Sequence, residues 1–282
     1  MTRFASALFV ACLALAAGCG VSGESNVTFV TPDRMAGGLI VILPGIEGES
    51  EYNHDIRRGL VLAGINQAMP IYNWGRPVPG LGMILNQMDF VGNRLAGVRI
   101  AKLIENYQDE HPGRPVFLVG HSGGGGVAVF AAEGLSEGRQ VDGLVLLSAS
   151  IWAGYDLTKA LGRCRSGIVN FYNPEDVGLL AIGTTVTSNV DGMRGPSAGL
   201  NGFDTAKAGA LRDKMAAYAK LYQETVSGGG DSHTAVTKPG YVSTCVAPWV
   251  ISTSWPARAA SRGSPQLPPA GQPKAVASRT SP

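Results

Sequence analysis

After its first twenty residues the chain has no apolar run long enough to span a lipid bilayer. It also lacks an excess of either charge, because 23 Lys and Arg against 21 Asp and Glu leave a net charge of +2. A nucleic-acid-binding protein normally carries a basic patch, so this balance argues against a nucleic-acid partner. Cys, His and acidic residues do not show metal-ligand spacing, and the glycine run 123–126 lacks the lysine of a phosphate-binding loop. We therefore expect no metal and no cofactor.

The N-terminal segment differs from the rest of the chain. Arg3 is the only charged residue before an apolar run over residues 4–17, which is typical of a secretory signal peptide. The segment ends in Leu-Ala-Ala-Gly-Cys19, which resembles the lipobox of bacterial lipoproteins. This resemblance implies that residues 1–18 are a signal peptide and that Cys19 carries a lipid. We expect export to the bacterial cell envelope with a membrane anchor; a soluble secreted or periplasmic protein is the alternative.

The chain has only four cysteines. Cys12 lies in the predicted signal peptide and Cys19 is the predicted lipidation site, which leaves Cys164 and Cys245. An exported protein meets conditions that permit disulfides, so we expect these two residues to pair.

Apolar runs typical of buried strands alternate with segments of helical spacing, and this alternation predicts a doubly wound, mostly parallel α/β sheet of about six strands with helices on both faces. The catalytic domain is expected over residues 38–254. Residues 19–37 are expected to be a lipidated, flexible leader with an edge strand at 27–30, and residues 255–282 a disordered Pro/Ala/Ser-rich tail. The expected strands are 38–43, 68–74, 116–119, 141–147 and 167–172, and the main expected helices are 53–64, 93–111, 205–225 and 242–250.

A glycine-flanked serine organises the centre of the chain. Ser122 lies in Gly-His-Ser-Gly-Gly, between the apolar strand 116–119 and an alanine-bearing helical segment. This is the G-x-S-x-G nucleophile elbow, which exposes a serine hydroxyl at the end of a strand. Side chains at Gly120 and Gly124 would strike the neighbouring strand and helix. Two other matches, at Ser136 and Ser197, lack the strand before and the helix after, so we predict Ser122 as the nucleophile.

A serine hydroxyl needs a base to remove its proton, and the chain has four histidines. Only His233 follows Ser122, as the order Ser, acid, His of the elbow motif requires. Asp176 follows the strand 167–172 and is the favoured acid, with the adjacent Glu175 as the alternative. Asp231 is a weaker candidate.

Two backbone N–H groups must stabilise the oxyanion that forms during acyl transfer. Gly123 follows the nucleophile and supplies one of them. The other is expected from the loop Pro44-Gly45-Ile46 at the end of the strand 38–43, through the N–H of Ile46.

Over residues 38–252 these motifs resemble the α/β-hydrolase superfamily of the serine esterase and lipase type, with Pro44 replacing the His of the family's His-Gly-x loop. The resemblance implies ester hydrolysis through an acyl-enzyme at Ser122. The alternatives are an acyltransferase or peptidase with the same triad, or a non-catalytic binding module at the cell surface. The expected substrate is a small-molecule ester with an apolar acyl or aromatic group, and the loop 183–204 could act as a lid. Candidate pocket residues are Trp74, Met83, Met88, Phe90, Ile151 and Trp152.

Overall fold

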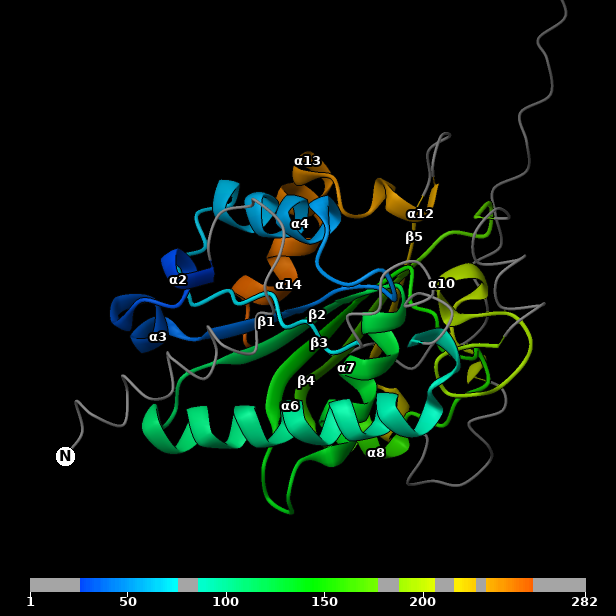
Figure 1. Ribbon diagram of the computed structural model, residues 1–282, viewed down its shortest axis with the longest axis horizontal. Coiled ribbons are helices and arrows are strands. Elements are labelled where there is room, and N and C mark those ends of the chain that lie inside the picture. The colour runs from blue at the N-terminus through cyan, green and yellow to red at the C-terminus, as the bar shows by residue number, and fades with distance from the viewer. Residues whose placement is uncertain (1–25, 76–85, 177–187, 206–215, 227–231, 256–282) are drawn as a thin grey trace, which may run out of the picture.

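A parallel β-sheet forms the centre of the computed structural model, which describes residues 26–75, 86–176, 188–205, 216–226 and 232–255 (Figure 1). The strands lie in the order β1-β2-β3-β4-β5, and every neighbouring pair is parallel. All residues of β1, β2 and β3 are buried. Their side chains point alternately to the two faces of the sheet, and helices cover both faces. The strands are β1 (Leu39–Leu43), β2 (Val116–His121), β3 (Val141–Leu147), β4 (Cys164–Tyr172) and β5 (Leu221–Thr225).

Residues 68–71 extend the sheet beyond β1. The backbone N–H of Ile40 donates to the Ala68 carbonyl at 2.8 Å, and that of Ile42 donates to the Pro70 carbonyl at 2.9 Å. Pro70 has no N–H to donate, which explains why this segment forms isolated parallel bridges and no continuous strand. Five strands and this segment confirm the expected mostly parallel sheet of about six strands.

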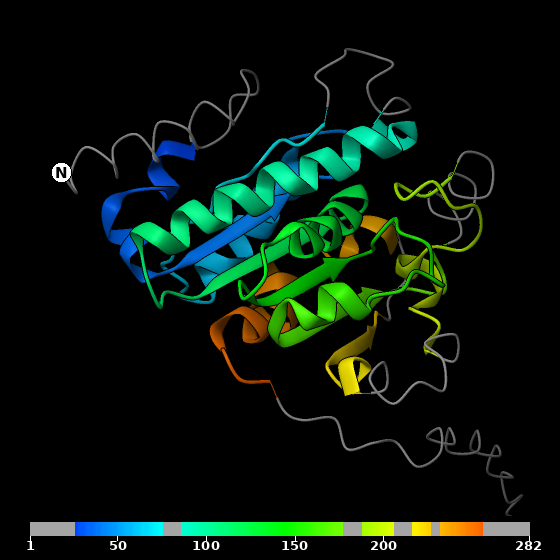
Figure 2. The same ribbon diagram turned by 90° about the horizontal axis from the view of Figure 1, so that it is seen from below.

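Helices cover both faces of the sheet, as Figures 1 and 2 show. The chain passes from β1 through α4 to residues 68–71, then returns through α6 to β2 on the other side of β1. Such a reversal opens a crevice at the carboxyl ends of the two diverging strands. One face carries α6 (Phe90–Glu110), α7 (Gly123–Gly134) and α8 (Thr158–Gly162); the other carries α4 (Glu51–Leu62), α13 (Pro239–Tyr241), the π-helix η2 (Val242–Val246) and α14 (Ala247–Ile251).

The expected flexible leader and edge strand are wrong for residues 26–37, which form α2 (Asn26–Phe29) and α3 (Pro32–Gly37). The fully buried Arg57 holds this segment: its guanidinium donates to Asn26 Oδ1 at 2.9 Å and lies 4.0 Å from the centre of the Phe29 ring. Met35 is buried in the core. The folded domain therefore begins at least twelve residues before the expected boundary at 38.

The expected helix 205–225 is also wrong at its C-terminal end, where Leu221–Thr225 form the edge strand β5. Leu221 and Tyr222 are buried on opposite faces of the sheet, Tyr222 against Trp249 of α14, and this packing decides the conformation of so short a segment. The helix expected over 242–250 is present as η2 and α14. Trp255, assigned to the tail, is buried and packs edge-on against Trp249 with ring centres 4.9 Å apart.

The expected disulfide between Cys164 and Cys245 does not form, and both cysteines are free. Cys164 is the first residue of β4 and is buried in the core on the face of the sheet that α6, α7 and α8 cover. Cys245 is exposed on η2, whose buried residues Val242 and Val246 pack on the opposite face of the sheet. A bridge would have to pass through the sheet.

Several predictions concern residues outside the described ranges: the signal peptide, lipidation of Cys19, the tail from residue 256, Met83, Asp231 and the lid residues 183–187. Among the described helices, none combines the length and apolar character needed to cross a membrane.

Candidate active site

Ser122 occupies the sharp turn between β2 and α7, at the carboxyl edge of the sheet. Its backbone angles are φ 50° and ψ −120°, a strained conformation for a residue with a side chain. The neighbouring strand holds the turn in place: the Ser122 N–H donates to the Leu147 carbonyl at 2.9 Å. The Ser122 carbonyl accepts from the N–H groups of Gly125 and Ser150 at 3.0 and 2.9 Å. The structure therefore places Ser122 in the geometry of a nucleophile elbow.

Glycine is required on both sides of this turn. A β-carbon at Gly120 would collide with the backbone of Gly124 and Gly125 in the first turn of α7. A β-carbon at Gly124 would collide with the carbonyl oxygens of Leu43 and Pro44 at the end of β1. The absence of both side chains lets α7 start directly above the strand ends, as the sequence predicts.

His233 and Asp176 meet at the same edge of the sheet. His233 lies in α12 (Ser232–Ala235), and its Nδ1 is 2.9 Å from Asp176 Oδ2 in a buried hydrogen bond. Asp176 follows β4 in a turn held by Asn173, whose carbonyl accepts from the Asp176 N–H and whose side-chain oxygen accepts from the Glu175 N–H. This turn buries Asp176 and leaves Glu175 exposed. Of the two candidate acids, Asp176 is therefore the one that orients His233.

His121 packs between the elbow and His233. Its ring centre is 5.1 Å from that of His233, and its Nε2 lies 3.4 Å from the His233 carbonyl oxygen. Burial, together with the nearby His233, lowers the pKa of His121 to about 3, so the ring stays neutral. Because His121 precedes Ser122 directly, this contact brings α12 close to the elbow.

The other two histidines make different contacts. His54 is in α4, where Arg57 lies 3.0 Å from its Nδ1. His111 follows α6 at the amino end of the sheet, where it stacks on Tyr107.

The loop after β1 lies against the elbow. A β-carbon at Gly123 would be 2.8 Å from Ile46 Cγ2, so the side chain of Ile46 lies directly beside Gly123. Two side chains fix the loop: Trp74 Nε1 donates to the Pro44 carbonyl at 2.7 Å, and Asn86 Nδ2 donates to the Ile46 carbonyl at 3.0 Å. Donors held in advance suit transition-state stabilisation, because they need not reorganise when charge develops. Asn86 was not predicted from the sequence, since one amide in a polar loop carries no distinguishing pattern.

Glu47 folds back over the same loop. A β-carbon on Gly45 would collide with its carboxylate, which lies 3.4 Å from the Ser50 hydroxyl and 3.9 Å from His121 Nδ1. Burial raises the pKa of Glu47, and the backbone N–H groups of Glu47 and Gly45 partly oppose this shift. The Glu47 carboxylate thus fills the inside of the bend beside Gly45.

The sequence around the elbow matches a known family. Residues 99–175 match Hydrolase_4, described as serine aminopeptidase, S33. The matched segment runs from α6 through the elbow to the residue before Asp176, and it coincides with the strand–turn–helix geometry described above. The chain has the α/β-hydrolase fold, and the family that its residues 99–175 match is one of hydrolases. No curated protein sequence matches the chain.

Several solved structures resemble this fold. One is a predicted CIB-like hydrolase from Thermoplasma acidophilum, 13% identical over 78% of this chain and 87% of that one, with a TM-score of 0.44. Another is the esterase PE8, 14% identical over 73% and 88% of the two chains, with a TM-score of 0.46. The NocB thioesterase domain of the nocardicin cluster is 16% identical over 76% and 92%, with a TM-score of 0.41.

An apolar wall stands beside Ser122 in this fold. Around the position of a β-carbon on Gly123, Trp74 Cζ2 and Val190 Cγ1 each lie at 3.3 Å, next to Ile46. Val190 also fills the space above Gly126, where Ile151 approaches to 3.5 Å. Trp74 and Ile151 were predicted at this rim, whereas Ile46 as a wall residue and Val190 were not, because a single apolar residue in a loop gives no periodic signal.

The remaining described pocket candidates lie further out. Met88 is exposed, the Phe90 ring packs against Gly192, and the Trp152 ring packs against Gly154 and Gly195.

Asp191 follows Val190 in the loop that forms this wall. Both carboxylate oxygens are buried, and burial raises the pKa of Asp191 to about 6, an effect that the backbone N–H groups of Asp191, Met193 and Trp152 partly oppose. Because the folded pKa lies above the unfolded value, Asp191 contributes stability that is full below about pH 4 and is lost as pH rises through about 6.

Asp191→Asn is therefore expected to be neutral near pH 4 and to stabilise the protein by about 1–2 kcal/mol at pH 7.5. Urea unfolding of both proteins at the two pH values measures this difference. An equal difference at both values would show that the Asp191 carboxylate does not titrate in this way.

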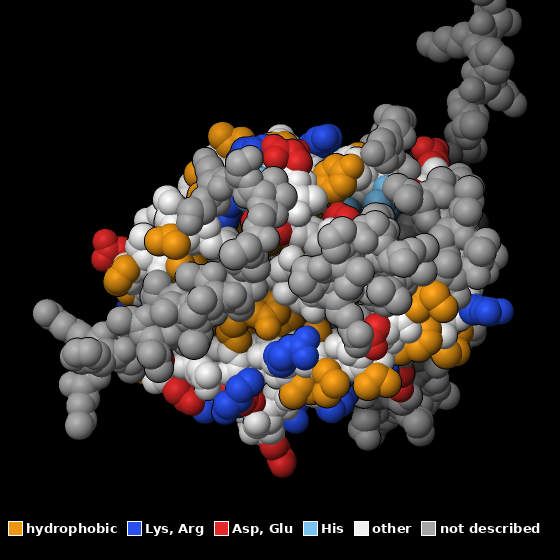
Figure 3. All heavy atoms as spheres, in the orientation of Figure 1, with side chains coloured by type: hydrophobic (Ala, Val, Ile, Leu, Met, Phe, Trp, Pro, Cys, Tyr) orange, Lys and Arg blue, Asp and Glu red, His pale blue; other side chains and the backbone are white. Residues whose placement is uncertain are grey.

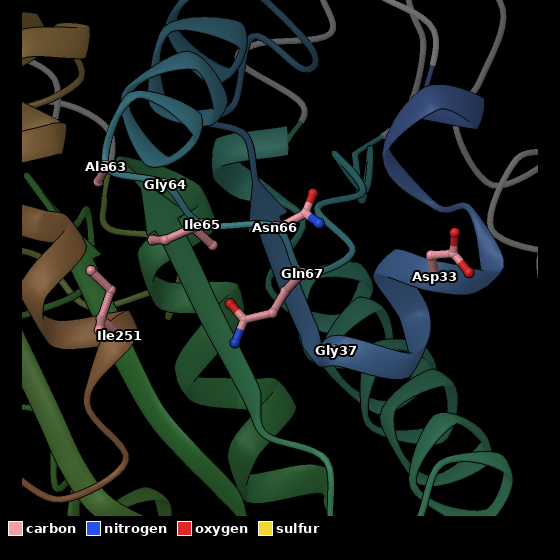
Figure 4. Close-up of a pocket in the computed structure, with 8 residues that line it drawn as sticks. All are labelled: Asp33, Gly37, Ala63, Gly64, Ile65, Asn66, Gln67 and Ile251. Atoms are coloured by element: carbon pink, nitrogen blue, oxygen red, sulfur yellow. The ribbon is translucent and has the colours of Figure 1, made fainter.

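A hollow lies at the other end of the sheet. A cavity of about 410 Å³ opens at the amino ends of β1 and of residues 68–71 (Figure 4). Its walls carry no histidine or serine, and Ser122 and His233 lie at the carboxyl edge. The residues that line it are Asp33, Gly37, Ala63, Gly64, Ile65, Asn66, Gln67 and Ile251.

Proposed function

We propose that this protein is a serine hydrolase that cleaves carboxylic esters through an acyl-enzyme on Ser122. The hydrogen bond between His233 Nδ1 and the buried Asp176 carboxylate, beside a strained serine elbow, carries the proposal. A carboxylate on Nδ1 fixes the tautomer whose free Nε2 can accept a proton, which is the arrangement a serine nucleophile needs.

The proposed reaction has two halves. In the first, Ser122 Oγ attacks the ester carbonyl carbon while His233 Nε2 takes the hydroxyl proton, and the N–H groups of Gly123 and Ile46 stabilise the oxyanion. The intermediate collapses, and the alcohol leaves with the proton from His233. In the second half, His233 removes a proton from water, which attacks the acyl carbon. Collapse then releases the acid and restores Ser122.

The wall of Ile46, Trp74 and Val190 supports an apolar acyl or aromatic group as the part of the substrate beside Ser122. Export and membrane attachment through Cys19 remain part of the proposal and rest on the N-terminal sequence. Incorporation of labelled palmitate, compared between wild type and Cys19→Ser, would test the attachment.

A fluorescent phosphonate probe tests the serine chemistry, because it reacts only with an activated serine. We expect labelling of the wild-type protein at Ser122, mapped by mass spectrometry, and no labelling of Ser122→Ala or His233→Ala. Ser136→Ala is the matched control: it changes the serine of a second glycine-flanked motif and should label as wild type. Folded wild-type protein that is not labelled would favour the non-catalytic binding module.

A further inference from the structure

The outer face of α6 carries apolar side chains where a surface helix usually carries polar ones. Met88, just before the helix, is 52% exposed, and Val91, Leu95 and Val98 are 72%, 53% and 53% exposed. These four residues are spaced three or four positions apart, so they form one stripe along the helix. The inner face is separately occupied, because Ala96, Ile100 and Ile104 pack into the core. The stripe is therefore not needed for folding.

Basic side chains border this stripe. Arg94 and Lys102 are 53% and 69% exposed and pair with the more buried Glu133 and Glu105 at 3.7 and 3.6 Å, and Arg99 is also exposed. No acidic residue between positions 88 and 104 is exposed: Asp89, the only acid there, is half-buried and caps the helix by accepting from the Gly92 N–H. Figure 3 shows hydrophobic and basic side chains together over the N-terminal half of α6. An apolar stripe beside positive charge fits the interface of an anionic lipid bilayer.

The stripe begins next to the active site. Asn93, on the first turns of α6, donates to the Val190 carbonyl at 3.2 Å, and Val190 forms the wall beside Ser122. The Phe90 ring packs against Gly192, and the next residue, Met193, is a further exposed apolar side chain. A lipid surface on this face would therefore lie close to the mouth of the site.

We propose that the outer face of α6 docks onto anionic phospholipid membranes and holds the mouth of the active site against the lipid surface. The docking needs no catalysis, so its test can fail or succeed independently of the serine chemistry.

Flotation with lipid vesicles tests the docking. The chain from residue 20 onward keeps every described residue and lacks Cys19. We expect it to bind vesicles of phosphatidylglycerol and phosphatidylcholine, and to bind pure phosphatidylcholine more weakly. Leu95→Gln/Val98→Gln should lower the partition coefficient about tenfold or more, because both apolar contacts are lost. Arg99→Gln/Lys102→Gln should weaken binding to the anionic vesicles about fivefold for each charge and leave binding to neutral vesicles unchanged.

Leu62→Gln is the matched control, since Leu62 is 70% exposed on α4, across the sheet from α6. It should bind as wild type, and circular dichroism should show the same fold for all variants. Two results would overturn the proposal: wild-type protein that does not float, or the Leu95→Gln/Val98→Gln variant floating like wild type. A wild-type dimer that this variant converts to a monomer, seen by light scattering, would assign the face to a second copy of the chain instead.

Discussion

Asp176→Asn should lower kcat for ester hydrolysis by about 10⁴. The Asp176 carboxylate accepts the Nδ1 proton of His233 and so keeps Nε2 free to take the proton of Ser122. An amide of the same shape can present its N–H to Nδ1, which favours the wrong tautomer while the packing stays the same. The assay is hydrolysis of a small chromogenic ester, with circular dichroism to verify the fold.

Glu175→Gln is the matched control, because it makes the same chemical change one residue earlier. Glu175 is exposed and its backbone N–H bonds to Asn173, so its side chain is not needed for the turn. We expect wild-type activity. A large loss in Glu175→Gln with little loss in Asp176→Asn would reverse the assignment of the acid.

Gly124→Ala is expected to destabilise the protein by about 3 kcal/mol or more. This is the upper end of the usual cost of a larger side chain in a well-packed core. Its β-carbon would collide with two backbone carbonyl oxygens, those of Leu43 and Pro44, which cannot rotate away as a side chain can. Relief requires α7 to move off the end of β1, and that movement would also separate Gly123 from Ile46. Urea unfolding followed by circular dichroism measures the loss.

Gly240→Ala provides the comparison. Gly240 lies in the short helix α13, and a β-carbon there meets no atom within 4 Å. Alanine at such a position is expected to be neutral or to stabilise by about 0.4–1 kcal/mol. If both alanine variants unfold at the same urea concentration as the wild type, this result would contradict the close contact between Gly124 of α7 and the end of β1.

The elbow could be predicted from sequence because its signals are local. A buried strand, two glycines that flank a serine and a helix follow one another within about twenty residues, and each has a distinct pattern. Asp176 and His233 were predicted from chain order, which the fold imposes once the elbow is located. Between Glu175 and Asp176 the sequence could not decide, because the hydrogen bonds of Asn173 determine which of the two carboxylates is buried.

The predictions that were wrong depend on contacts between distant parts of the chain. Residues 26–37 have the sequence of a polar leader, and the contacts that order them come from Arg57, which binds Asn26 and packs on Phe29. Leu221–Thr225 are too short for periodicity to separate strand from helix, and pairing with β4 decides. The pairing of Cys164 with Cys245 was inferred from the expected export of the protein and from the number of cysteines left. Neither observation tells on which face of the sheet a cysteine lies.

The four consecutive glycines at the start of α7 let that helix pack directly against the end of β1, Ala149 and Val190. The space beside Ser122 is bounded by Ile46, Trp74 and Val190, none of which belongs to α7. In the proposed reaction, single exchanges at Val190 would therefore change the preferred acyl group and leave Ser122, His233 and Asp176 as they are.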